Sequence, residues 1–119
     1  MLSTTQEKVL SDWLELLKNF QQLISDSPID IGVIKNNWSK IENYLRSYII
    51  SLDINELPFE ERSQWQTWQT ETYRYVRLLN TELLFWYSAS KNQTQNDRFL
   101  VVHNRLEQMI SLTESLSLQ

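Results

Sequence analysis

Cysteine is missing from the 119-residue chain, and glycine and proline are nearly so, with one and two residues respectively. Without cysteine the protein can form no disulfide, no thiolate metal site and no cysteine nucleophile, and we expect a cytoplasmic protein. A single glycine excludes a glycine-rich phosphate-binding loop. An all-β fold needs a turn residue roughly every 8–12 positions, so the scarcity of glycine and proline argues against one. These absences together favour a helical protein.

Long apolar runs and a surplus of basic residues are also lacking. The longest wholly apolar run, Leu83 to Tyr87, is far too short to span a membrane. The first residues are neither basic nor apolar, so no signal peptide is predicted. The net charge is −4 and the pI ≈ 4.9, whereas proteins that bind nucleic acid usually carry excess lysine and arginine to neutralise phosphates. We therefore expect neither nucleic acid nor a membrane as a partner.

The residues that could carry out catalysis or bind a metal form no recognisable set. His103 is the only histidine, and the position three before it is Leu100, where a di-iron bundle would need a glutamate. A boundary histidine that touches Glu107, one turn later, explains His103 better than a catalytic or metal-binding role. Glu60 and Glu61 fit the first turn of a helix, where carboxylates interact favourably with the helix dipole. The sequence therefore predicts no catalytic residue, no cofactor, no metal site and no enzymatic activity.

Apolar residues at helical spacing are the dominant pattern of the chain. Pro28 and Pro58 mark helix boundaries, and Ser27 or Asp30 is a suitable N-cap. The third helix would be ~48 Å long against ~31 Å for the first, so it should overhang its neighbours or bend. The predicted fold is an all-α, antiparallel up-down four-helix bundle in one domain, residues 1–119. Its helices are expected at about 4–24, 31–52, 58–89 and 95–116.

Each predicted helix has one apolar stripe that would face a common core. For the second helix the stripe comprises Ile34, Trp38, Ile41, Leu45, Tyr48 and Leu52. For the third it comprises Trp65, Trp68, Thr72, Tyr75, Val76, Leu79, Leu83, Trp86 and Tyr87. For the fourth it comprises Phe99, Val102, Leu106, Met109, Ile110, Thr113 and Leu116. Whether the third helix is continuous across its polar stretch at residues 67–72 is left open.

Some large apolar residues fall outside these stripes. On a helical wheel Leu78 and Phe85 lie at roughly 200–220° from Trp65, almost opposite the core stripe of the third helix. Leaving a leucine or phenylalanine exposed forgoes about 1.5–3 kcal/mol of burial free energy, so two that share a face suggest a contact surface. The fourth helix shows the same pattern, with Val101 and Leu112 expected opposite its core stripe. The candidate interaction surface comprises Leu78, Phe85, Arg74, Glu71, Val101 and Leu112.

Three uses of this surface stay open: contact with a second copy of the chain, contact with a different protein, or intramolecular packing alone. We expect a homo-oligomer or a protein complex. Replacing Leu78 and Phe85 by glutamate should then abolish association and leave helicity intact. Loss of the fold would instead place both residues in the core.

Three stretches resemble the small PatD-type heterocyst frequency control proteins of cyanobacteria. They are Ile49 to Asp53 ("IISLD"), Glu56 to Pro58 ("ELP"), and the step from Arg77 to Leu79 ("RLL") in a long, glutamine-rich helix. The total length and the final helix, "RLEQMISLTESL", are also similar to that family.

The resemblance implies a cytoplasmic regulator without enzymatic activity that acts on the tubulin-like division protein FtsZ. By altering FtsZ assembly, such a protein tunes cell division and how many cells in a filament differentiate. The resemblance brings no binding residues with it. The alternative is a structural homo-oligomeric scaffold or adaptor with an unknown protein partner. A bundle that binds a small ligand or metal is disfavoured, because no cluster of polar residues is directed into the predicted core.

Overall fold

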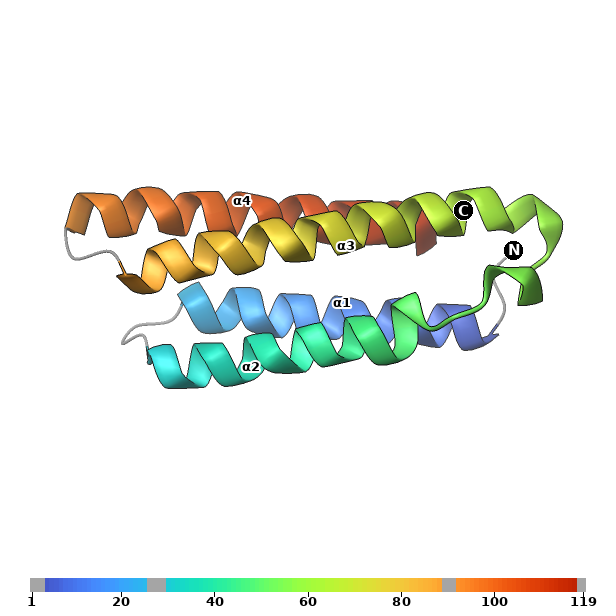
Figure 1. Ribbon diagram of the computed structural model, residues 1–119, viewed down its shortest axis with the longest axis horizontal. Coiled ribbons are helices and arrows are strands. Elements are labelled where there is room, and N and C mark those ends of the chain that lie inside the picture. The colour runs from blue at the N-terminus through green and yellow to red at the C-terminus, as the bar shows by residue number, and fades with distance from the viewer. Residues whose placement is uncertain (1–3, 26–29, 89–91, 118–119) are drawn as a thin grey trace.

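Four α-helices make up most of the computed structural model, which describes residues 4–25, 30–88 and 92–117 (Figure 1). They are α1 (Thr4–Ser25), α2 (Ile31–Tyr44), α3 (Phe59–Ser88) and α4 (Asn92–Ser117). A π-helical segment (Leu45–Ile50) continues α2, and a 3₁₀ turn (Ile54–Glu56) precedes α3. The described residues include no strand. The predicted all-α four-helix bundle is confirmed, although the predicted end of the third helix, Ala89, lies outside the described residues.

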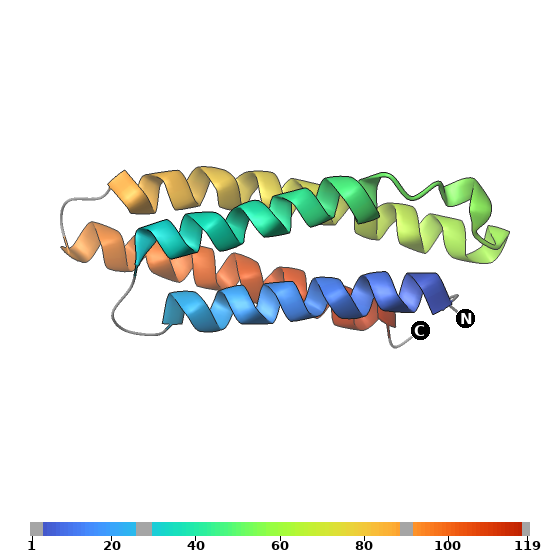
Figure 2. The same cartoon turned by 90° about the horizontal axis from the view of Figure 1, so that it is seen from below.

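The helices run side by side, each antiparallel to the one before it (Figures 1 and 2). The bundle is elongated, with extents of 50 × 22 × 19 Å. Closely packed helix pairs are α3 with α4, α1 with α4, and α1 with α2, whereas the backbones of α2 and α3 approach each other least of the neighbouring pairs. One apolar core receives side chains from all four helices.

α3 is continuous over 30 residues, including the polar stretch at residues 67–72, and so is about 45 Å long. Its first turns project beyond the C-terminal end of α4 (Figures 1 and 2). Arg62 secures the loop before α3: its Nε donates to the Leu57 carbonyl at 3.0 Å, and its Nη2 donates to the Asn55 carbonyl at 3.0 Å. The excess length of this helix therefore appears as an overhang, one of the two predicted outcomes.

The predicted core stripe of α3 agrees closely with the structure. Seven of its nine members are buried, and only Tyr75 and Tyr87 are half-buried. On α4, the six predicted core residues after Phe99 are buried, and Phe99 is half-buried. Trp68 Nε1 donates to Thr113 Oγ1 at 3.0 Å, and this hydroxyl donates in turn to the Met109 carbonyl at 2.9 Å. The buried Trp68 indole N–H and the Thr113 hydroxyl thus both have a hydrogen-bond partner in the core.

α2 begins at an aspartate cap. Asp30 Oδ1 accepts hydrogen bonds from the backbone N–H of Gly32 at 2.9 Å and of Val33 at 3.3 Å. These bonds satisfy N–H groups that have no partner within the first turn of a helix. Of the two predicted caps, Asp30 is confirmed, and Ser27 lies outside the described residues.

The second predicted stripe is wrong near its end, where the helix becomes π-helical. Tyr48 is 58% exposed, whereas Ile49 is fully buried at 0%. A π-helical turn holds more residues than an α-helical turn because its hydrogen bonds join residues i and i+5. The residue four positions after Leu45 therefore faces the core, in place of the residue three positions after it.

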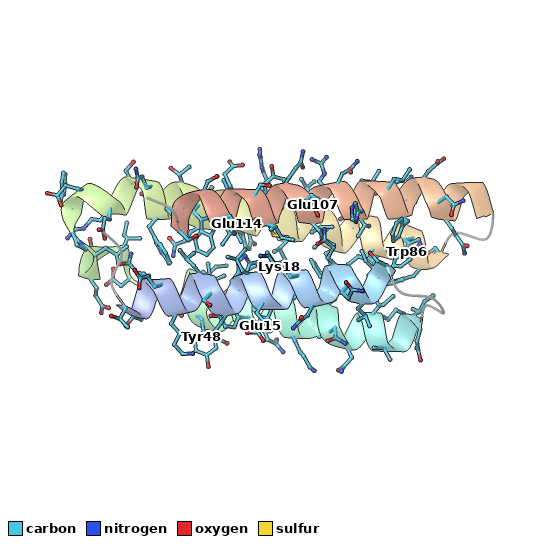
Figure 3. The ribbon with its side chains drawn as sticks, turned by 180° about the vertical axis from the view of Figure 1, so that it is seen from behind. Glu15, Lys18, Tyr48, Trp86, Glu107 and Glu114 are labelled. Atoms are coloured by element: carbon cyan, nitrogen blue, oxygen red, sulfur yellow. The ribbon has the colours of Figure 1, made fainter. Side chains whose placement is uncertain are left out.

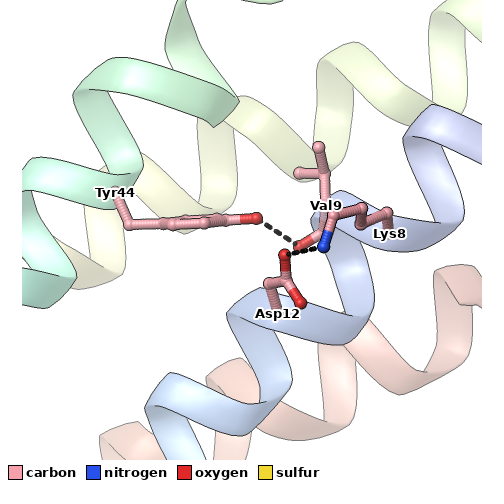
Figure 4. A network of polar contacts seen from close by, with 4 residues as sticks. All are labelled: Lys8, Val9, Asp12 and Tyr44. Atoms are coloured by element: carbon pink, nitrogen blue, oxygen red, sulfur yellow. Dashed lines mark hydrogen bonds and ion pairs between the residues drawn. The ribbon is translucent and has the colours of Figure 1, made fainter.

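α1 and α2 are joined by a tyrosine. The Tyr44 hydroxyl donates to the Val9 carbonyl at 3.1 Å, beside an exposed ion pair in which Lys8 Nζ lies 3.0 Å from Asp12 (Figure 4). The Tyr44 ring also stacks on Trp13, with ring centres 6.0 Å apart. Burial, followed by the negative charge of Asp12, raises the pKa of Tyr44 to about 12. This tyrosine thus remains protonated well into the alkaline range.

Candidate protein-interaction surface

The six residues of the predicted surface come from α3 and α4, whose relative register is fixed by two contacts. Trp68 bonds to Thr113, and Glu82 pairs with Arg98 at 3.1 Å. Because the helices are antiparallel, Val101 lies level with about residue 80 of α3, and Leu112 with about residue 69. We refer to the side of the bundle that carries these residues as the α3–α4 face. Its members are Glu71, Arg74, Leu78, Phe85, Val101 and Leu112.

The two residues of α3 are exposed, as the wheel predicts. Leu78 is 41% exposed and Phe85 is 50% exposed. They are seven positions apart, which corresponds to about two turns, so they lie about 10.5 Å apart along the helix. They therefore form a short apolar stripe on the outside of the bundle.

The expectation that Val101 and Leu112 lie opposite the core stripe of α4 is wrong. Both residues are half-buried, and Leu112 packs against the core. At 100° per residue each lies only about 80–100° from buried Val102, which places it on the flank of the helix. They therefore border the exposed stripe of α3 and add little accessible apolar area.

Phe85 is partly covered by a side chain of α4. The Arg98 guanidinium carbon lies 4.8 Å from the centre of the Phe85 ring, and Arg98 Nη1 also pairs with Glu82. A cation over an exposed aromatic ring contributes about 0.5–1 kcal/mol. Phe85 thus helps to hold α3 against α4 and still leaves half of its surface accessible.

Glu71 and Arg74 pair with each other on the surface of α3. Arg74 Nη2 lies 2.7 Å from Glu71 Oε2. Exposed pairs of this kind contribute only about 0–1 kcal/mol to stability. They provide a charged border next to Leu78, where a partner could form additional hydrogen bonds.

A second surface, between α2 and α3, did not form part of the predicted site. Tyr73 lines two adjoining hollows there, one of about 440 Å³ and one of about 200 Å³. We call the two together the α2–α3 groove. The larger hollow is also lined by Ile50, Gln69 and Thr70, and the smaller by Glu42, Leu45, Arg46, Val76, Arg77 and Asn80. Sequence periodicity does not reveal this groove, because Ile50 reaches its edge only through the π-helical segment.

Among the interactions of the described residues, His103 forms neither a hydrogen bond nor an ion pair with Glu107. Its ring stacks on Phe99 with centres 6.1 Å apart. The Glu107 carboxylate instead accepts a hydrogen bond from Gln21 of α1. A second link between α1 and α4, the ion pair of Lys18 with Glu114 at 3.8 Å, lies on the side of the bundle that Figure 3 shows. Glu107 and Glu114 thus both help to join α4 to α1.

The described part of the chain offers neither a metal site nor a membrane-spanning helix. Within residues 4–25, 30–88 and 92–117, no group of three or more histidine, cysteine, aspartate or glutamate side chains is placed to hold a metal ion. None of the helices in these ranges combines the length and the apolar character that a membrane span requires.

Comparison of the chain with protein-family models, with curated proteins and with solved structures finds no match.

Proposed function

We propose that this chain is a non-enzymatic regulatory protein that binds a protein partner through its α3–α4 face. The observation that carries the proposal is the stripe of Leu78 and Phe85, which are 41% and 50% exposed although the same helix has a full core stripe on its other side. Apolar and aromatic residues bordered by charged ones are typical of the central part of a protein interface. Arg74 and Glu71 supply that charged border.

The proposed partner is FtsZ, and the support for this choice is the resemblance of three sequence stretches to PatD-type proteins. In this role the chain acts in the cytoplasm and alters FtsZ assembly, and thereby cell division and the frequency of heterocyst differentiation. A homo-oligomer would present the face several times. It would then bridge neighbouring filaments by multivalent binding.

Co-sedimentation of the purified protein with polymerising FtsZ tests the proposal, with GDP in place of GTP as the control. The protein should pellet only when polymer forms. The double variant Leu78→Glu, Phe85→Glu should remain in the supernatant and keep the circular dichroism of the parent. Leu84→Glu is the matched control, because Leu84 is a 56% exposed leucine of α3 outside the α3–α4 face.

Light scattering on the same variants separates FtsZ binding from the scaffold alternative. Loss of self-association with unchanged pelleting would assign Leu78 and Phe85 to contacts between copies of the chain. No pelleting at concentrations well above about 10 μM would remove FtsZ as the partner, because binding that weak leaves little complex at cellular concentrations.

A further inference from the structure

The α2–α3 groove follows from the loose approach of these two helices. Long side chains bridge them: Trp38 Nε1 donates to Asn80 Oδ1 at 3.3 Å, and Gln69 Nε2 donates to the Ile49 carbonyl at 2.6 Å. From the level of Gln69 to that of Asn80 the groove follows about 16 Å of α3, or three helical turns. This length fits one face of a short partner helix.

The π-helical segment (Leu45–Ile50) shapes one end of the groove. It turns Ile49 into the core and leaves Ile50 45% exposed at the groove edge. Gln69 satisfies two carbonyls at this helix end, since its Nε2 also lies 3.5 Å from the Leu52 carbonyl. Short π-helical segments occur frequently at functional sites. The irregularity thus coincides with the larger hollow.

The groove has an apolar floor and an apolar edge. Leu45 and Val76 are buried and line the smaller hollow from opposite walls. Tyr73 and Ile50, each 45% exposed, line the larger hollow. An amphipathic helix binds such a groove by inserting apolar side chains at helical spacing, and an exposed tyrosine is a frequent anchor in interfaces.

The charge of the groove is opposite to that of the protein. Arg46 lines it from the π-helical segment and Arg77 from α3. Glu42 is the only carboxylate among the lining residues of the two hollows, although the chain carries a net charge of −4. Arg46 donates to Asn43 at 2.8 Å, and the Arg77 guanidinium carbon lies 5.7 Å from the centre of the Tyr73 ring. Among the described carboxylates, none forms an ion pair with either arginine. Both guanidinium groups can therefore donate paired hydrogen bonds to a carboxylate of a partner.

We propose that the α2–α3 groove binds an acidic amphipathic helix of a partner protein. Apolar side chains of that helix pack between Ile50 and Tyr73, and its carboxylates pair with Arg46 and Arg77. A second copy of the chain fits less well, because a two-fold interface at this face would bring the same two arginines of each copy close together. The groove lies on the flank of α3 opposite the α3–α4 face, so the two surfaces can be tested independently.

Fluorescence anisotropy with a labelled synthetic peptide tests this proposal. The probe has about 18 residues, or five helical turns, with leucine at positions i, i+3 and i+7 and glutamate on its polar face. The comparison peptide carries lysine in place of every glutamate. The acidic peptide should bind more tightly than the basic one, and its affinity should fall as salt is added, because the proposed pairs are screened.

The double variant Arg46→Glu, Arg77→Glu should weaken binding of the acidic peptide by at least about tenfold, since like charges replace two charge-assisted pairs. Lys40→Glu, at an exposed position of α2 that does not line the groove, is the charge-reversal control and should bind as the parent does. Circular dichroism confirms that each variant is folded. In a nuclear magnetic resonance titration with the acidic peptide, the amide signals of Ile50 and Tyr73 should show the largest shifts.

Three results would overturn the proposal: equal affinity for the two peptides, no loss in the double variant, or no binding of the acidic peptide at millimolar concentration. A change of oligomeric state in the double variant would also overturn it and assign the groove to self-association. None of these readouts involves FtsZ or the α3–α4 face, so this proposal and the proposed function can fail separately.

Discussion

The two flanks of α3 differ in how they meet their neighbouring helices. On the α4 side, a buried hydrogen bond, an ion pair and the contact of Trp86 with Phe99, whose ring centres are 6.0 Å apart, join the helices along most of their length. On the α2 side, long polar side chains reach across, and a groove remains. α3 thus packs closely against α4, and we call this contact the closed seam. Against α2 it leaves a groove, and we call this contact the open seam.

The difference follows from the regularity of the partner helices. α4 is an unbroken α-helix of 26 residues, whereas α2 has 14 residues before it becomes π-helical. A change of helical pitch alters which residue faces the core. The contacts of the closed seam are therefore mostly buried and stabilise the fold, whereas the open seam retains accessible apolar and charged groups.

The largest expected effect is at the closed seam. Trp68→Ala removes a fully buried indole and should lower the free energy of unfolding by about 3–5 kcal/mol. Tyr73→Ala, at the open seam, should cost no more than about 1 kcal/mol, because nearly half of the side chain is already exposed. Urea denaturation followed by circular dichroism measures both values. Similar losses for the two variants would contradict the distinction between the seams.

The buried hydrogen bond of the closed seam gives the next effect. Thr113→Val keeps the shape of the side chain and leaves Trp68 Nε1 buried without its acceptor, which should cost about 1–3 kcal/mol. Trp68→Phe serves as the second arm of a double-mutant cycle. If the two losses simply add, the hydrogen bond contributes nothing to stability.

A smaller effect is expected at the open seam from Gln69→Ala. This change removes the donor to the Ile49 carbonyl and should cost about 0.5–1.5 kcal/mol. Hydrogen exchange should accelerate in residues 49–57, with little change in the amides of α4. Uniform acceleration over the whole bundle would show that the two seams are not independent.

The smallest effect at neutral pH concerns Tyr87, which belongs to the open seam through the Lys35 ammonium 5.0 Å from its ring centre. Burial, followed by the charge of Glu42, raises the pKa of Tyr87 from 10.0 to about 12. The folded state therefore binds the phenolic proton more tightly than the unfolded state does. Stability from this group is complete below pH 10 and is lost as the pH rises toward about 12.

Tyr87→Phe should reduce this alkaline loss and leave stability at neutral pH nearly unchanged, because the Tyr87 hydroxyl has no hydrogen-bond partner among the described residues. Urea unfolding at neutral pH and across the interval from 10 to about 12 tests it. Tyr44→Phe provides the contrast, because that hydroxyl donates to the Val9 carbonyl and its removal should cost stability at neutral pH as well. Equal behaviour of the two variants would contradict these assignments.

Most of the fold is evident in the sequence where helices are regular. The stripe from Trp65 to Trp86 follows ideal α-helical spacing over the whole of α3, and the structure buries it. The exposure of Tyr48 could not be predicted, because the π-helical turn depends on tertiary contacts such as that of Gln69 with the Ile49 carbonyl. Local periodicity carries no information about that contact.

The candidate surfaces show the same limit. Exposure of Leu78 and Phe85 follows from their angle on one helix, which the sequence provides. The flank position of Val101 and Leu112 also follows from their angle on α4, whereas the α2–α3 groove depends on how far α2 lies from α3. Such distances between helices arise from packing of the whole core.

All five tryptophans of the chain are buried: Trp13, Trp38, Trp65, Trp68 and Trp86. The tryptophan fluorescence of the protein therefore originates in the core and not on either proposed binding surface. A partner that binds the surface without altering the core should leave the emission maximum unchanged. A spectral shift on binding would instead report that the helices have rearranged.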